Sequence, residues 1–137
     1  MKLLKRRTKK RSQRTGATAV EFSLTLPILL IFLFATFELG RGNMMLNTTE
    51  AAAYEAARVA IVPGATVAEA EAAAELILAT AGVEVSDFSI VPANLDTASD
   101  SVAVTIDVSF AENSLFVPNF LDTARFVRTC ELSRENQ

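Results

Sequence analysis

A carboxylate lies four positions behind a glycine–alanine junction, at the start of a long apolar stretch. Gly16 and Ala17 form the junction, and Glu21 is the fifth residue counted from Ala17. If the chain is cut after Gly16, a new α-ammonium group appears on Ala17. The Glu21 carboxylate can compensate this ammonium in a low-dielectric medium, on its own chain or on a neighbouring helix. Such a charge pair would fix the axial register of one helix against another.

A simpler interpretation of Glu21 needs no cut. A carboxylate near the N-terminus of a membrane helix can lie in the headgroup layer, where the helix dipole stabilises it by ~0.3–1 kcal/mol. A charge at the bilayer centre costs ~2.5–3.5 kcal/mol, which makes a carboxylate in such a segment a functional candidate. Both interpretations of Glu21 stay open from these residues alone.

The composition argues against enzymatic and metal chemistry. The 137 residues include no His and one Cys, so the commonest general base and metal ligand is missing. Cys130 cannot form an intramolecular disulfide or a zinc cluster; we expect a buried apolar side chain, with an intermolecular disulfide as the alternative. Asp96, Asp100 and Asp107 lack the spacing of an EF-hand loop. Without a nucleophile–base pair or a glycine-rich phosphate loop, we expect neither an enzyme nor a cofactor or metal site.

The N-terminal segment predicts a membrane helix behind a basic leader. Residues 1–16 contain eight Lys or Arg and no acid, whereas residues 22–37 contain no charge. Together with its flanks the apolar segment covers residues 17–40, about 36 Å of helix and enough to span a bilayer. The positive-inside rule places the leader in the cytoplasm and the rest outside. Because all sixteen acids follow the leader, we expect no nucleic-acid partner.

The apolar segment with its basic leader is consistent with three kinds of membrane-targeting segment. A secretory signal peptide fits poorly, because the apolar core is long and no small-residue cleavage site follows it. An uncleaved membrane anchor is the second possibility, and a cut after Gly16 is the third.

At the far end of the span, Glu38 and Arg41 are three positions apart and face each other on a helix. They are either a pair that ends the span and orients the outer domain, or two solvated charges.

Downstream, the pattern predicts an α+β domain outside the membrane. A projecting helix is expected over 41–62 and ends before Pro63-Gly64. Gly40 and Gly42 could interrupt the helix between this part and the membrane span. Its alanines, 51–53, 56 and 57, suit either a face between subunits or packing against the protein's own sheet. Thr66 and Glu69 form a capping-box pattern that opens a second helix to about Ala81. The domain over 63–137 then contains about three antiparallel strands, at 88–91, 102–110 and 123–132, which the helices must cover.

At this point the run RTGATAVEFSLTLPILLIFLFATFELGR, residues 14–41, resembles the N-terminal signature of the TadE-like family, minor pseudopilins of tight-adherence (Tad/Flp, type IVc) pili. The resemblance implies a pilin-like fold and a class III signal peptide over 1–16, cut after glycine by a prepilin peptidase. Gly16 would be the last leader residue and Ala17 the mature N-terminus. The other matching positions are the Glu21-Phe22 pair, Pro27 in the apolar run, and Glu38, Gly40 and Arg41 at its close.

One departure refines the resemblance. Major Flp pilins carry Glu-Tyr where this chain has Glu21-Phe22, and they are shorter, so a minor TadE-like subunit is favoured, with a TadF-like one still possible. The implied partners are the prepilin peptidase, other pilins and pseudopilins through the N-terminal helix, and the inner membrane. The implied role is support of pilus assembly and adhesion. The alternative is an uncleaved single-pass protein with an extracytoplasmic binding or sensing domain.

Overall fold

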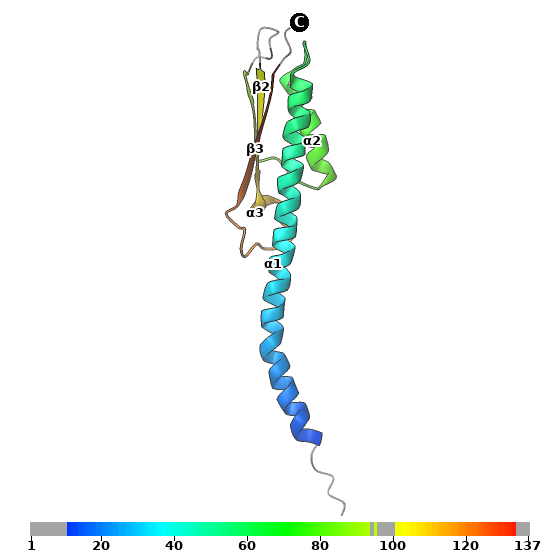
Figure 1. Ribbon diagram of the computed structural model, residues 1–137, viewed down its shortest axis with the longest axis vertical. Coiled ribbons are helices and arrows are strands. Elements are labelled where there is room, and N and C mark those ends of the chain that lie inside the picture. Colours follow the sequence, from blue (N-terminus) through cyan, green and yellow to red (C-terminus); the bar gives the residue numbers. More distant parts are fainter. Residues whose placement is uncertain (1–10, 94, 96–100, 134–137) are drawn as a thin grey trace, which may run out of the picture. The chain divides into compact units, whose positions relative to one another are not determined.

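The computed structural model describes residues 11–93, 95 and 101–133 (Figure 1). Most of the basic leader lies outside these residues, as do Asp96 and Asp100. The elements run in the order α1, α2, β1, β2, α3 and β3. The chain divides into two units, the first ending at Thr36 and the second beginning at Phe37.

Helix α1 covers Arg11–Ala60 and therefore contributes to both units. Neither Gly40 nor Gly42 interrupts it, and Pro27 lies inside it. In the first unit the helix satisfies its own hydroxyl groups. Those of Ser23, Thr25 and Thr36 each donate to a backbone carbonyl three or four residues earlier. Hydroxyl groups bonded in this way need no partner outside the helix, which suits an apolar environment.

Helix α2 covers Val67–Thr80 and begins as the sequence predicts. Thr66 is the N-cap: its hydroxyl accepts from the backbone N–H of Glu69, and the Glu69 carboxylate accepts from the N–H of Thr66 at 2.8 Å. The chain leaves the helix through Gly82, whose φ of +59° is a conformation that favours glycine. The capping-box prediction is confirmed at both of its positions.

Over the described residues the sheet has three antiparallel strands, as predicted, and their order is β1-β2-β3. They cover Asp87–Val91, Ser101–Ser109 and Arg125–Ser133. The central strand β2 shows the alternation that the sequence predicts, with every second residue buried. Phe110 differs from the prediction, because it does not extend this strand. It begins the one-turn helix α3, Phe110–Asn113, which follows β2 directly.

The core lies between one face of this sheet and the second-unit part of α1 together with α2 (Figure 1). The four inward residues of β2 and three residues of α2, Ala70, Ala74 and Leu78, are buried there. The contribution of α1 is mostly alanine, which lets the helix backbone approach the sheet closely. Ala52, Ala53, Ala56 and Ala57 are buried in the protein's own core, whereas Ala51 is exposed. The structure thus favours own-sheet packing over a face between subunits.

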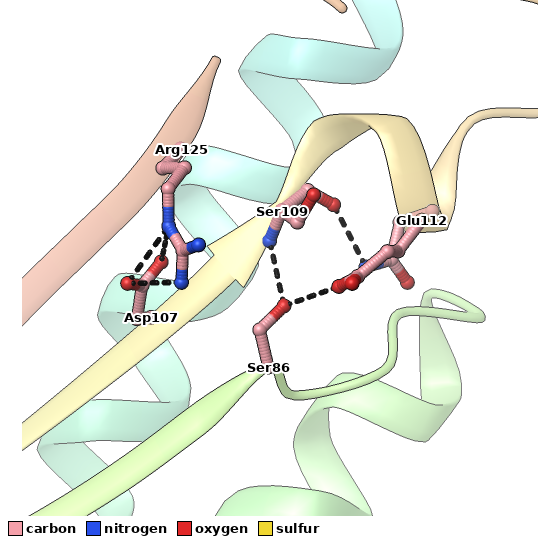
Figure 2. Close-up of polar contacts among 6 residues, drawn as sticks. Ser86, Asp107, Ser109, Glu112 and Arg125 are labelled. Carbon is pink, nitrogen blue, oxygen red and sulfur yellow. Dashed lines mark hydrogen bonds and ion pairs between the residues drawn. The ribbon is translucent and has the colours of Figure 1, made fainter. Parts of the chain in front are cut away.

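Polar contacts fasten the strand ends beside α3, as Figure 2 shows. The Arg125 guanidinium donates twice to the Asp107 carboxylate across β2 and β3, and this neighbour raises the pKa of Arg125. The Ser86 hydroxyl donates to Glu112 at 2.6 Å and accepts from the backbone N–H of Ser109 at 3.0 Å. Asp107, one of the three acids considered for calcium, is therefore engaged by an arginine.

Candidate membrane, processing and assembly site

The apolar part of α1 in the first unit keeps its side chains outside any core. Among the described residues, α1 is the one helix long and apolar enough to cross a membrane, and its most apolar window is unburied. The large apolar residues from Val20 to Phe34 are exposed, except Leu26, which is partly buried. A surface this apolar is unstable in water, because burial of apolar area is the main driving force for folding and association. The segment therefore requires lipid or other apolar helices around it.

The glycine–alanine junction lies within this helix. Gly16 and Ala17 are both helical and exposed. A Cβ atom added to Gly16 would meet no other atom within 4 Å. Glycine also destabilises a helix interior by ~0.5–1 kcal/mol relative to alanine. The junction is thus sterically open and is a weak point of the helix.

Glu21 and Phe22 follow one turn later, both exposed. On a helix, residues four apart are neighbours on one face, so Glu21 lies over Ala17. No side chain among the described residues of this unit pairs with the Glu21 carboxylate. Its backbone carbonyl accepts from the Thr25 hydroxyl at 3.1 Å. With respect to the described side chains, the carboxylate can accept a cation from its own N-terminus or from another chain.

Glu38 is the first charged residue after the apolar segment, and it binds a distant loop in the second unit. Its two carboxylate oxygens accept backbone N–H bonds from three consecutive residues, Asn119, Phe120 and Leu121, at 2.7, 2.8 and 3.2 Å. A carboxylate that receives several N–H bonds is held in one orientation. Glu38 thus attaches the loop between α3 and β3 to α1.

Arg41 binds a different set of backbone groups. Its guanidinium donates to the carbonyl oxygens of Ala81 and Gly82, both at 2.8 Å, and to that of Asn113 at 3.2 Å. Ala81 and Gly82 follow the last residue of α2, where helix carbonyls lack partners within the helix. A cation at a helix C-terminus also complements the helix dipole. Arg41 therefore provides hydrogen-bond donors for backbone carbonyl groups at the C-terminal ends of α2 and α3.

Glu38 and Arg41 do not pair with each other, which corrects the expectation that their three-residue spacing makes them face one another. The physical reason is that each finds several backbone partners in a loop, and charged groups gain more from such bonds than from an exposed pair on one helix. Neither side chain is merely solvated, because both are partly buried. Their role at a membrane boundary stays a prediction.

The two glycines beside Arg41 differ sharply. A Cβ on Gly40 would meet nothing within 4 Å. A Cβ on Gly42 would lie 3.1 Å from Leu121 and 3.4 Å from Phe126, because this position is buried against the sheet. Sequence reasoning considered Gly42 only as a possible helix break. Its observed role is to let α1 and the loop before β3 approach each other.

Asn113 is a residue that sequence reasoning missed. Its side-chain amide is buried and donates to the carbonyl oxygens of Glu84 and Ser109, both at 3.0 Å. Its own carbonyl accepts from Arg41. Asn113 therefore links the segment after α2, the end of β2 and α1. A single asparagine at the end of a one-turn helix gives no local signal of such partners.

Cys130 lies on β3, opposite Val104, on the side of the sheet that faces the helices. It is a free thiol and is partly buried, and this burial raises its pKa. A raised pKa leaves little thiolate, which is the reactive form. Over the described residues, no cluster of three or more Cys, Asp or Glu is arranged to hold a metal ion.

The arrangement defines a class of protein. A long apolar helix near the N-terminus could cross a membrane and leads into a small α+β domain stabilised by its own core. The model of the TadE family, described as TadE-like protein, matches residues 16–58. The match confirms the resemblance to this family and indicates a protein associated with the Tad pilus system. No curated protein and no solved structure matches the chain.

Proposed function

We propose that the chain is a minor pseudopilin of a type IVc (Tad/Flp) pilus. It enters the inner membrane with residues 1–16 in the cytoplasm and the domain after Arg41 outside. A prepilin peptidase then cuts after Gly16. The mature chain joins other pilins and pseudopilins through α1 and supports pilus assembly and adhesion. In this role the chain is the substrate of an enzyme and has no catalytic activity of its own.

The observation that carries this proposal is the unburied apolar segment of α1 with a glycine–alanine junction at its start and a carboxylate one turn later. Membrane insertion accounts for the apolar surface, but it gives no function to a carboxylate at the start of the segment, where a charge that entered the bilayer would cost free energy. A cut after Gly16 gives Glu21 a function, because it creates the ammonium that the carboxylate can pair with. The TadE family match over residues 16–58 supports the same proposal.

The cut is tested by the Gly16→Phe variant in the native host. A Cβ atom at this position meets no neighbouring side chain within 4 Å, so the substitution is chosen to disturb recognition by the peptidase more than the fold. Gly40→Phe is the matched control, because its site is equally open. We expect the intact mass of the wild type and of Gly40→Phe to lack residues 1–16. Gly16→Phe should retain them.

A full-length mass for the wild type would refute the pseudopilin proposal. Normal processing of Gly16→Phe would refute the assignment of the junction. The first result would instead favour an uncleaved single-pass protein whose outer domain binds or senses a component of the envelope.

A further inference from the structure

We propose that the loop between α3 and β3, residues 114–124, is a second membrane-contacting element, which places Leu115, Phe116, Val117 and Phe120 against the lipid of the outer surface. This inference rests on the proposed membrane span of α1. It assigns to the outer domain a contact with lipid in addition to its covalent connection to the helix.

The loop exposes an unusual concentration of large apolar side chains. Leu115, Phe116 and Val117 are 76%, 65% and 85% exposed, and Phe120 is 55% exposed. No charged residue occurs between Glu112 and Asp122. Single exposed apolar residues are ordinary on a protein surface, but a contiguous uncharged group of them marks a site of contact with another protein or with a membrane.

The position of the loop favours a membrane. Glu38 directly follows Phe37, the last residue of the uncharged segment, and its carboxylate accepts the N–H bonds of Asn119, Phe120 and Leu121. These bonds hold the loop against Glu38, within the second unit, next to the last uncharged residue in sequence. Figure 1 shows the loop, in brown, extending to α1 before it returns to β3.

The helix surface at this level continues the apolar character. Phe37 and Leu39, on either side of Glu38, are both exposed and belong to the same unit as the loop. If α1 spans the bilayer, these residues lie at its outer boundary. Apolar side chains at that depth gain free energy by leaving water for the acyl region, as in interfacial protein segments.

Several backbone groups of the loop already have hydrogen-bond partners, which suits a membrane interface. An unpaired N–H group is costly where water is scarce, but three consecutive N–H groups here are bonded to Glu38. Pro118 has no N–H group, and the Asn119 side-chain amide donates to the carbonyl oxygen of Val117 at 3.3 Å. The part of the loop nearest to α1 therefore carries little uncompensated polarity into the interface.

The test uses the full chain in nanodiscs that hold one copy each, with lipids brominated on their acyl chains. In a Cys130→Ser background, an environment-sensitive fluorophore is attached at Val117→Cys. Leu33→Cys, within the apolar segment, is the reference for lipid contact. Leu76→Cys on α2 is the control, because Leu76 is 69% exposed but lies outside the loop and the apolar segment. Quenching of each fluorophore by the brominated lipid is measured.

We expect quenching at Val117 to be several-fold stronger than at Leu76 and to approach that at Leu33. Quenching at Leu33 alone would overturn the inference and leave the proposed membrane span intact. The absence of quenching at Leu33 would overturn both the span and the inference. A blue shift at Val117 that develops only with two copies per nanodisc, without quenching, would identify a second copy of the chain as the occupant and overturn the lipid contact.

Discussion

The guanidinium of Arg41 donates a hydrogen bond of 2.8 Å to the carbonyl oxygen of Gly82, a residue just beyond the end of α2. Together with its bonds to Ala81 and Asn113, this contact joins α1 to two other segments through one side chain. Arg41 lies just after the apolar segment in the sequence. This residue at the end of the predicted span therefore also stabilises the fold of the outer domain.

We predict that Arg41→Ala destabilises the outer domain by about 1.5–3 kcal/mol, the range for hydrogen bonds to a charged group whose partners are left unpaired. Arg58→Ala is the control on the same helix, because Arg58 pairs with Glu55 at the surface. Exposed ion pairs of this kind contribute little to the stability of a protein. The free energy of unfolding of each full-length variant is measured in detergent by circular dichroism. Equal losses for the two variants would contradict the role of Arg41.

A second prediction concerns the close approach at Gly42. Gly42→Leu should destabilise the domain by about 1–3 kcal/mol, because the added side chain must displace Leu121 and Phe126 from their packing. Gly40→Leu should be neutral or slightly stabilising, since its site is open and leucine is the better helix former. Thermal unfolding of both variants in the same detergent provides the comparison. If Gly42→Leu unfolds at the wild-type temperature, the close approach is not a constraint on the sequence.

Local signals account for the parts of the fold that the sequence predicts. Thr66 and Glu69 satisfy each other's backbone groups within one turn, so their spacing alone reveals the start of α2. The alternation along β2 reveals which residues of the central strand face the core, because side chains alternate between the two faces of a sheet. The apolar segment of α1 is equally local, since its length and lack of charge define it.

The partners of Glu38 and Arg41 could not be predicted in this way. Glu38 binds amides 81 to 83 positions further along the chain, and Arg41 reaches carbonyl groups 40 and 72 positions away. Backbone groups are present at every residue, so the sequence does not identify which of them a charged side chain will meet. The spacing of Glu38 and Arg41 suggested a pair, but tertiary structure offered each of them stronger partners.

A third prediction follows from the cap of α2. The backbone N–H and the hydroxyl of Thr66 lower the pKa of Glu69. A carboxyl group with a lowered pKa stabilises the fold above its unfolded value, which is ~4.3 for Glu, and loses this contribution as the pH falls through the lower folded value. We therefore expect acidification from neutral pH to lower the thermal midpoint of the wild type more than that of Glu69→Gln.

The control for this experiment is Glu71→Gln, which removes a carboxylate from the exposed surface of the same helix, outside the capping box. The difference between the wild type and each variant is measured as a function of pH in detergent. A Glu69→Gln variant that follows the wild-type curve throughout would show that the cap does not contribute to the acid sensitivity of the domain.

The last prediction separates the two interpretations of Glu21. Glu21→Ala should leave membrane insertion and removal of residues 1–16 intact, because neither step uses the carboxylate. Assembly should fail or decline strongly, since the Ala17 ammonium would lose its partner in a low-dielectric environment. Glu21→Gln keeps the size of the side chain without its charge and should behave like Glu21→Ala if the charge is what matters. Immunoblots of membranes measure insertion and processing, and counts of surface pili in the native host measure assembly. Wild-type piliation in both variants would contradict the pairing and leave Glu21 as an acid at the headgroup level near a helix N-terminus.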